Sequence, residues 1–269
     1  MQENEIAEPR REANSLLTFA LEKDKTFLIA YPEYRLSAEE ETRFLQLLPR
    51  RAAREPLQYI TGRQEFYGLD FEVSPDVLIP RPETEIIVEN AIEILRRKEN
   101  ARFCEIGTGS GCISISILND LKMARAVGVD ISEKALRIAQ KNAEKHEVSR
   151  RIDLKISDLF ASVKGEEFDL IVSNPPYISA EDFEALQPEV KKFEPRNALT
   201  DERDGFSVIE KIILHSPKFL KPGGFLLMEI GFDQAKKTRE MFSPEIWQAF
   251  EILPDLQGIP RTVKAQTHD

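Results

Sequence analysis

The sequence predicts an α/β protein with a parallel, doubly wound sheet and a smaller helical domain before it. Three observations predict this fold: residues 1–55 have only helical patterns, short apolar strands alternate with helices from residue 83 onward, and a stretch rich in Gly and Pro punctuation lies between. Apolar strands spaced by helices are typical of parallel sheets covered on both faces.

The amino-acid composition limits the classes of protein to which this chain can belong. The hydrophobic share of 41% is ordinary for a chain that buries a core. The formal net charge of -10 argues against binding that rests mainly on nucleic-acid phosphates, so we expect no direct nucleic-acid binding. Cys104 and Cys112 form no C-x-x-C pair and are expected to be buried thiols in a reducing compartment. The N-terminus lacks an apolar signal core and no apolar run reaches the ~18 residues of a membrane span, so we expect a cytoplasmic protein without membrane association.

Residues 1–55 are predicted to form the helical domain. Apolar residues between Leu16 and Leu21 lie on one helical face. A second helix is expected to begin at Ser37, because Ser37 and Glu40 have the spacing of a capping box. Residues 1–80 carry 10 Lys/Arg against 15 Asp/Glu, which is not the charge of a duplex-binding module.

Residues 56–82 are predicted to form a β-hairpin that links the two domains. Aromatic and β-branched residues alternate there between Gly and Pro. Residues 83–269 then form the second domain, in which Ser132–His146 has a clear helical pattern with a capping serine. Ligands of such sheets bind beyond the carboxyl ends of the strands, near the point where the strand order reverses. The candidate strands are residues 102–106, 125–130, 152–157, 168–173, 224–230 and 248–253.

A glycine-rich loop follows the strand at 102–106. Glycine permits a tight turn and a close approach of the backbone to a ligand, and the N-terminus of the next helix offers free N–H donors. A dinucleotide loop of the G-x-G-x-x-G kind is one alternative, although Cys112 stands where its third glycine would be, and a plain structural turn is another. The loop consists of Gly107, Thr108, Gly109, Ser110 and Gly111.

Acidic residues end the next two strands. Asp130 lies about 20 residues after the loop, where a carboxylate accepts both hydroxyls of a ribose in NAD or in S-adenosylmethionine. A simple lead into the following helix is the alternative. Asp158 could accept from an adenine amino group, or could be an exposed loop acid. These strand ends predict a nucleoside pocket, but they do not separate hydride transfer from methyl transfer.

The fourth strand ends in Asn174-Pro-Pro-Tyr177, which favours methyl transfer. Displacement at a sulfonium is accelerated largely by positioning and desolvation. An amide or aryl amine nitrogen is a poor nucleophile because its lone pair is delocalised. The Asn174 side-chain oxygen and a proline-flanked carbonyl can accept its two hydrogens, hold it toward the methyl group and favour the developing positive charge. Tyr177 offers a π face to the planar group, and a simple Pro-Pro strand terminator is the alternative.

Together these motifs resemble the HemK/PrmC family, the protein-(glutamine-N5) methyltransferases of peptide chain release factors. The resemblance implies a Rossmann-like class I methyltransferase sheet, and residues 1–55 as a domain that docks the substrate. The segments that carry the resemblance are PLQYITG (56–62), LIPRPETE (78–85), EIGTGSG (105–111), GVDIS (128–132), SDLF (157–160), SNPPYI (173–178), EPRNAL with DG (194–205) and KPGGFLLMEIG (221–231).

The resemblance also implies roles for individual residues. S-adenosyl-L-methionine is the implied cofactor, and release factors are the implied protein substrates. Ser110 and Leu159 depart from the commonest family form, where Thr and Trp are frequent. The residues expected to bind the cofactor are Gly107, Thr108, Gly109, Ser110, Gly111, Asp130, Asp158, Leu159 and Asn174. The residues expected to hold the glutamine of a Gly-Gly-Gln loop are Asn174, Pro175, Pro176 and Tyr177, with Asn174, Pro175 and Tyr177 as the catalytic set.

Several alternatives stay open at the level of sequence. A nitrogen methyltransferase acting on DNA adenine, ribosomal RNA or a ribosomal protein would also use NPPY, whereas an oxidoreductase would not. Arg81, Glu83 and Thr84 could shape the cofactor or glutamine site, or could simply start a helix. Arg196 could pair with acids of its own loop or remain solvated. The histidines have no neighbours of metal-ligand type, so we expect no metal.

Overall fold

The computed structural model describes residue 6 and residues 8–269. The chain divides into two compact units. The helical unit comprises the described residues up to Arg63 together with Gln187–Phe193, and the sheet unit comprises Gln64–Leu186 and Glu194–Asp269. The residues Gln187–Phe193 therefore interrupt the sheet unit in sequence but pack with the N-terminal helices.

The helical unit contains α1 (Pro9–Leu21), α2 (Lys25–Ala30), α3 (Ala38–Ala52), α4 (Leu57–Thr61) and α9 (Pro188–Phe193). The predicted capping box begins α3: the Ser37 hydroxyl accepts from the Glu40 N–H at 3.2 Å, and the Glu40 carboxylate accepts from the Ser37 N–H at 2.8 Å. Helix α1 packs against α3, and Leu16 and Leu21 are buried as the helical spacing predicted.

The predicted hairpin is present but shorter than residues 56–82. It consists of β1 (Arg63–Phe66) and β2 (Leu69–Glu72), whereas residues 57–61 form α4. Tyr67 and Gly68 connect the strands with φ of 52° and 71°, the left-handed conformations of a tight two-residue hairpin turn. The rings of Phe66 and Phe71 lie 6.2 Å apart and are buried in the core of the sheet unit.

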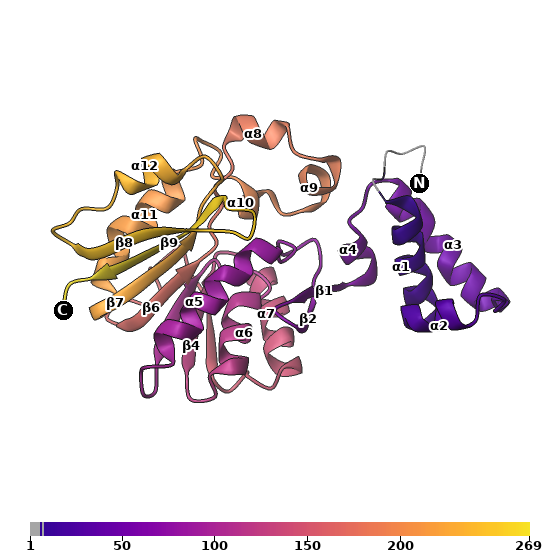
Figure 1. The fold of residues 1–269 in the computed structure, drawn as a ribbon, viewed down its shortest axis with the longest axis horizontal. Coiled ribbons are helices and arrows are strands. Elements are labelled where there is room, and N and C mark those ends of the chain that lie inside the picture. Colours follow the sequence, from indigo (N-terminus) through magenta and orange to yellow (C-terminus); the bar gives the residue numbers. More distant parts are fainter. Residues whose placement is uncertain (1–5, 7) are drawn as a thin grey trace. The chain divides into compact units, whose positions relative to one another are not determined.

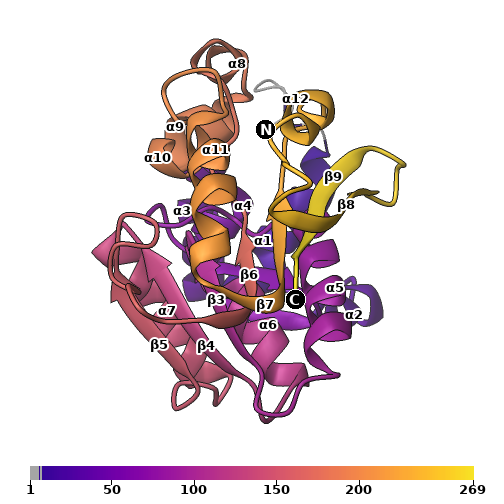
Figure 2. The same cartoon turned by 90° about the vertical axis from the view of Figure 1, so that its left-hand side faces the viewer.

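A seven-stranded sheet forms the centre of the sheet unit, in the order β5-β4-β3-β6-β7-β9-β8 (Figures 1 and 2). The neighbouring strands from β5 to β7 are all parallel. The order reverses between β3 and β6, which creates the predicted switch point. The strands are β3 (Arg102–Ile106), β4 (Arg125–Asp130), β5 (Ile152–Ile156), β6 (Phe168–Ser173), β7 (Leu220–Glu229), β8 (Trp247–Pro254) and β9 (Pro260–Thr267).

Strand β9 corrects the sequence prediction in two respects. All six predicted strands form, but β9 is a seventh, and it runs antiparallel to both β7 and β8. A short turn at Gly258, with φ of 81°, returns the chain directly from β8, so no crossover helix separates the two strands. Polar residues alternate with Val263 and Ala265 in β9, and this pattern is weaker than the apolar runs of the central strands β4, β6 and β7.

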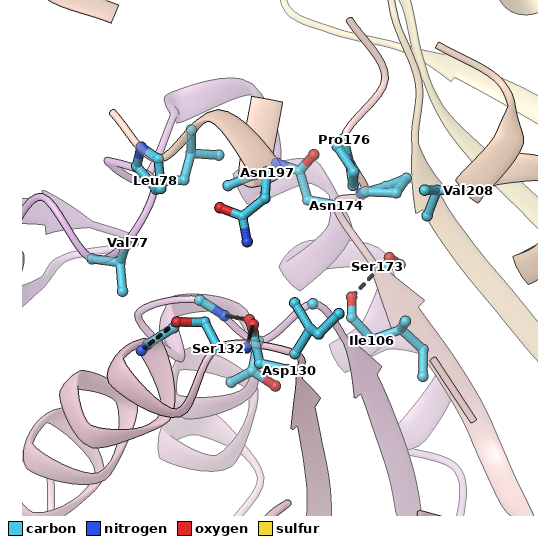
Figure 3. A pocket seen from close by; sticks show the side chains of 18 of the residues that line it. Val77, Leu78, Ile106, Asp130, Ser132, Ser173, Asn174, Pro176, Asn197 and Val208 are labelled. Atoms are coloured by element: carbon cyan, nitrogen blue, oxygen red, sulfur yellow. Dashed lines mark hydrogen bonds between the residues drawn. The ribbon is translucent and has the colours of Figure 1, made fainter. Parts of the chain in front are cut away.

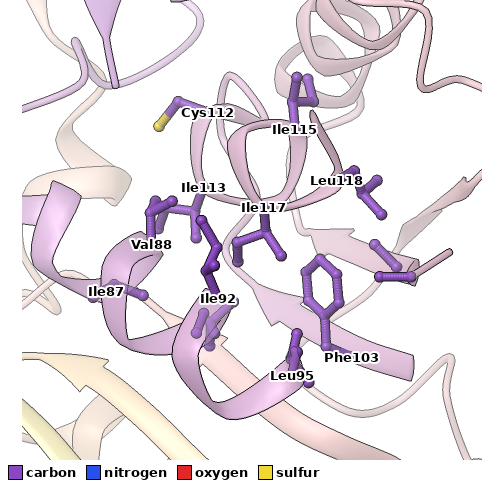
Figure 4. Packing of buried hydrophobic residues seen from close by; sticks show 14 of the residues in the cluster. Ile87, Val88, Ile92, Leu95, Phe103, Cys112, Ile113, Ile115, Ile117 and Leu118 are labelled. Carbon is purple, nitrogen blue, oxygen red and sulfur yellow. The ribbon is translucent and has the colours of Figure 1, made fainter. Parts of the chain in front are cut away.

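Helices cover both faces of the sheet, as a doubly wound fold requires. Successive residues of one strand serve the two faces: Phe103 packs in one core cluster and Cys104 in the other. Figure 4 shows α5 and α6 enclosing Phe103 with isoleucine and leucine side chains. The larger helices of the sheet unit are α5 (Glu85–Leu95), α6 (Cys112–Asp120), α7 (Glu133–Lys145) and α11 (Ser207–His215). The shorter ones are η2 (Pro82–Thr84), α8 (Ala180–Glu184), α10 (Arg196–Leu199), η3 (Ser216–Lys218) and α12 (Ala235–Arg239).

Within the part of the chain that the structure describes, no helix combines the length and the apolar character that crossing a bilayer would demand.

Candidate active site

A cavity of about 780 Å³ opens at the carboxyl ends of the parallel strands, beside the switch point. This volume lies in the range of small-molecule sites. Asp130 and Ser132 lie on one wall, and Asn174, Pro176 and Asn197 lie on the facing wall (Figure 3). The structure thus brings together residues from four strand ends that are far apart in the sequence.

The glycine-rich loop forms part of the cavity lining. Gly107, Gly109 and Gly111 all have positive φ, of 76°, 55° and 81°. The backbone N–H groups of Gly107 and Thr108 both donate to the carbonyl of Val129, at 2.9 and 3.0 Å, and this fixes the loop to β4. A Cβ at Gly111 would lie 2.8 Å from the terminal methyl group of Ile115 and 3.3 Å from the Cβ of Ala139, so a larger residue with this φ would be strained and would crowd α6 and α7. The loop therefore brings the N-terminus of α6 to the cavity, where Ser110 and Cys112 are among the lining residues.

Asp130 is held by two backbone donors. Its carboxylate accepts from the N–H of Gly109 and from the N–H of Ser132, both at 2.8 Å. Burial raises the pKa of Asp130, while the backbone hydrogen bonds oppose this rise. Two N–H donors leave further lone pairs on the carboxylate, because its two oxygens offer about four acceptor positions. Ser132 also caps α7, so this strand end does lead into the following helix, and the ribose role of Asp130 stays a prediction.

Asp158 and Leu159 line the cavity after β5. Leu159 has a left-handed conformation, with φ of 47°, that the Ser157 hydroxyl supports by donating to the Leu159 carbonyl at 2.8 Å. The same hydroxyl accepts from the Ser162 N–H at 3.0 Å. Hydrogen bonds thus fix the backbone of this loop, and the Asp158 side chain is exposed.

A chain of hydrogen bonds lies behind the NPPY segment. The Asn174 amide nitrogen donates to the Thr84 hydroxyl at 3.1 Å, and this hydroxyl donates to Glu229 at 2.6 Å. The Tyr177 hydroxyl donates to the other oxygen of Glu229 at 3.0 Å. Asn174, Pro175 and Pro176 line the cavity, whereas Tyr177 is not among the lining residues.

Burial governs the acid–base properties of this chain of groups. Glu229 is 2% exposed, and burial raises its pKa above the usual range of a glutamate. Burial and the neighbouring Glu229 carboxylate also raise the pKa of Tyr177, so its hydroxyl stays protonated and remains a donor. Glu229 was missed by the sequence analysis. The sequence feature that could have identified Glu229 is the presence of an acidic residue among the apolar residues of a strand predicted to be buried.

A second set of contacts supports the backbone of NPPY. The Gln234 side chain donates to the carbonyl of Tyr177 at 2.8 Å and accepts from the N–H of Gly231 at 2.8 Å. Gly205 has φ of 79°, and a Cβ there would lie 2.3 Å from the Tyr177 carbonyl oxygen. The glycine that follows Asp204 is therefore needed for close packing against the site.

The charged stretch before Gly205 shapes its own loop. The Asp201 carboxylate accepts from the N–H of Gly205 at 2.9 Å and from the N–H and hydroxyl of Ser207 at 2.8 and 2.7 Å. Glu202 pairs with Arg196, whose guanidinium lies 4.1 Å from the ring of Phe183. Of the two readings for Arg196, the structure shows the pairing within the loop.

Arg81 connects the LIPRPETE segment to the EPRNAL segment through an ion pair. It pairs with Glu194, a glutamate only 6% exposed that also accepts from the Ile79 N–H at 3.2 Å. Arg81 and Thr84 line the cavity, and Glu83 does not. The LIPRPETE and EPRNAL segments are therefore held together at one end of the cavity.

Glu105 is a second buried acid at the cavity that the sequence analysis did not single out. It is 1% exposed and accepts from the Ser114 N–H at 3.2 Å. Burial raises its pKa to about 8. Among the described residues, no three His, Cys, Asp or Glu side chains are grouped as a metal would require.

Comparisons with known proteins agree with this geometry. Residues 1–62 match the PrmC N-terminal domain, and residues 84–190 match the methyltransferase small domain. The release factor glutamine methyltransferase of Koribacter versatilis is 43% identical over 95% of this chain and 90% of its own length. That of Geobacter sulfurreducens is 44% identical over 97% of this chain and 90% of its own length.

The fold also has solved counterparts. The hMettl16 catalytic domain, in complex with MAT2A 3'UTR hairpin 6, superposes with a TM-score of 0.61. The match covers 81% of each chain at 18% identity, so it concerns the fold alone.

Proposed function

The chain belongs to the family of release factor glutamine methyltransferases, and from this premise we propose how its cavity performs the reaction. The protein is an S-adenosyl-L-methionine-dependent enzyme. It transfers a methyl group to the side-chain amide nitrogen, N5, of the glutamine in the Gly-Gly-Gln motif of peptide chain release factors.

The cofactor is assigned to the wall formed by the glycine loop, Asp130, Asp158 and Leu159. The donor set fits a nucleoside, because the Asp130 carboxylate is fixed by two backbone N–H groups and keeps lone pairs for ribose hydroxyls. Leu159 offers an apolar surface to the adenine ring. When bound, S-adenosyl-L-methionine supplies a methyl group activated on a sulfonium.

The substrate glutamine is assigned to Asn174, Pro175, Pro176 and Tyr177. The observation that carries the proposal is the position of Asn174 on the cavity wall that faces Asp130 (Figure 3). Its side-chain oxygen and the Pro175 carbonyl accept the two N–H hydrogens of the glutamine amide. Tyr177 does not line the cavity itself, and we retain it as the proposed third member of the catalytic set because it belongs to the same turn as Asn174 and Pro175.

These acceptors do two things for the reaction. They hold the planar nitrogen toward the cofactor wall, and they favour the positive charge that develops on the nitrogen. As the nitrogen–methyl bond forms, the bond between methyl and sulfur would break and its electron pair would stay on the sulfur, which leaves as a neutral thioether. The nitrogen then loses one of its two protons to solvent. A base with a matched pKa is not required, because the proton is acidic once the nitrogen carries positive charge.

Labelling with S-adenosyl-L-methionine carrying a radioactive methyl group tests the proposal. Purified release factor should acquire label, and a release factor with the Gly-Gly-Gln glutamine replaced by alanine should acquire none. Duplex DNA and ribosomal RNA serve as the competing substrates. Label on a nucleic acid, with none on the release factor, would overturn the proposed function.

A further inference from the structure

We propose that Thr84 and Glu229 are positioning residues, which fix the Asn174 amide so that its oxygen faces the substrate nitrogen. This inference rests on the proposed function of the NPPY segment. It concerns two residues that lie outside that segment, in η2 and at the end of β7.

The direction of the hydrogen bonds follows from which groups carry protons. In its ionised form Glu229 only accepts, so the Thr84 hydroxyl, 2.6 Å away, gives its proton to this carboxylate. The Thr84 oxygen then has lone pairs alone for Asn174, at 3.1 Å, and the Asn174 group that faces it must be the amide nitrogen. A flipped Asn174 would place its oxygen against an oxygen that has no proton left to donate. The Asn174 oxygen is thereby directed away from Thr84.

The anchor of this chain is the Glu229 carboxyl group, whose pKa burial raises and whose ionised form is favoured by hydrogen bonds from Thr84 and Tyr177 and by the charge of Arg261. Glu229 ends β7, where its backbone is in register with Thr262 of the neighbouring β9. Its second oxygen accepts from Tyr177 at 3.0 Å, so two hydroxyl donors stabilise the carboxylate against the rise in pKa that burial causes. Thr84 is itself 2% exposed, so water does not compete for its hydroxyl.

The hydrogen bonds from Asn174 through Thr84 to Glu229 also make the Asn174 side-chain oxygen a stronger hydrogen-bond acceptor. A hydrogen bond that ends on an anion polarises the groups before it, so Thr84 draws on the Asn174 N–H more strongly than a neutral partner would. Electron density on the Asn174 oxygen rises in response. An oxygen of this kind favours the positive charge that a glutamine nitrogen acquires during methylation.

Substitution of Thr84 by Val and by Ser separates positioning from packing. Thr84→Val keeps the shape and removes the hydroxyl, and Thr84→Ser keeps the hydroxyl and removes a methyl group. We expect Thr84→Val to lower kcat for release factor by about 10–100-fold, the usual effect of losing a supporting partner. We expect Thr84→Ser to stay within about threefold of the parent. The Kd of S-adenosyl-L-methionine should change less than about twofold in both variants.

Glu229→Gln provides a second, nearly isosteric variant. It removes the charge and adds donors that compete with Thr84 and Tyr177, so we expect a similar loss of kcat. Thr238→Val is the matched control, because Thr238 is fully buried in α12 and its hydroxyl has no partner among the described residues. Its kcat should equal that of the parent. Thermal unfolding of every variant shows whether the fold is intact.

The outcomes separate this inference from the proposed function. If the parent enzyme methylates the release factor and Thr84→Val is as active as Thr238→Val, the positioning role is overturned and the proposed function still stands. Equal losses in Thr84→Val and Thr84→Ser would also overturn it, because packing would then be the cause. A parent enzyme that leaves the release factor unlabelled would refute the function itself.

Discussion

At the scale of single residues, Asp130 shows how one side chain can serve fold and site together. Its carboxylate joins the glycine loop to the start of α7 through Gly109 and Ser132. The same arrangement fixes the direction of its remaining lone pairs. A flexible acid in this place would have to be ordered on binding, at a cost in affinity.

Asp130→Ala should therefore weaken the binding of S-adenosyl-L-methionine by about 10–100-fold. This range corresponds to the loss of a charge-assisted hydrogen bond of about 1.5–3 kcal/mol, with each 1.4 kcal/mol worth about tenfold in affinity. Isothermal titration calorimetry would measure the Kd. Asp158→Ala is the comparison, and we expect a smaller effect because that side chain is exposed. An unchanged Kd for Asp130→Ala would exclude the ribose role.

Glu105 makes stability depend on pH. Burial raises its pKa from the ordinary 4.5 to about 8, so between these values the folded state binds more protons than the unfolded state. Stability then falls as pH rises through this window. The free-energy cost of keeping an ionised Glu105 buried in the folded state is absent below pH 4.5 and fully present above about pH 8. Because a tenfold change in acid dissociation constant corresponds to about 1.36 kcal/mol, the full penalty amounts to a few kcal/mol.

Glu105→Gln should remove this pH dependence, since glutamine is neutral throughout. The free energy of unfolding of the variant, relative to the parent, should rise from about pH 5 to about pH 9. Urea denaturation followed by circular dichroism would measure both proteins at each pH. A difference that stays constant over this range would contradict the prediction.

At the scale of elements, the loop between α10 and α11 acts as a support for the NPPY turn. Asp201 closes this loop on itself, and Gly205 then packs directly against the Tyr177 carbonyl. Gln234 holds the same carbonyl from the segment after β7. The position of the catalytic turn is thus set by two segments that follow it in the sequence.

Gly205→Ala should lower kcat by about 10–100-fold, because the added Cβ would displace the Tyr177 carbonyl, and a shift of about 1 Å can cost this much. Gly165→Ala is the matched control: it has φ of 81° against 79° at Gly205, but nothing lies within 4 Å of its Cβ. Both variants should lose about 1–2 kcal/mol of stability from the strained conformation. Steady-state kinetics and thermal unfolding would separate the two effects. Equal kcat values for both variants would contradict the support role.

At the scale of the whole molecule, one short helix links distant parts of the sequence. Helix α9 lies between residues of the sheet unit in the chain, yet it belongs to the helical unit. Its Glu189 pairs with Arg51 at 3.2 Å and with Arg54 at 2.6 Å. The Arg51 side chain is only 6% exposed and also pairs with Glu12, so a buried guanidinium lies at the centre of a partly buried network.

Glu189→Ala should destabilise the helical unit by about 1–3 kcal/mol, because a buried guanidinium loses a charged partner. Glu8→Ala is the control, since Glu8 forms an exposed pair with Arg11 that should contribute less than about 1 kcal/mol. Hydrogen exchange in α1 and α3 would report the change. Exchange equal to that of Glu8→Ala would show that the network adds no stability.

The sequence by itself determined the order of the elements and the chemistry of the strand ends. Apolar runs located the central strands β3, β4, β6 and β7, because a strand buried on both faces must be largely apolar. The edge strands β5 and β8 were also located, although they contain exposed polar positions. The capping box at Ser37 and the turn glycines were visible for a similar reason: they satisfy constraints that are local in the chain. The glycine loop, Asp130 and the NPPY segment were identified in the same way, and their roles in binding stay predictions.

Only the tertiary structure decided how those strand ends are supported. The antiparallel β9, the place of α9 in the helical unit and the contacts of Glu229 with Thr84 and Tyr177 all join residues far apart in the chain. A sequence pattern records whether a residue suits burial, but it does not record which distant group will be its partner. Hydrogen bonds depend on atoms within about 3 Å of each other, and folding alone creates that proximity.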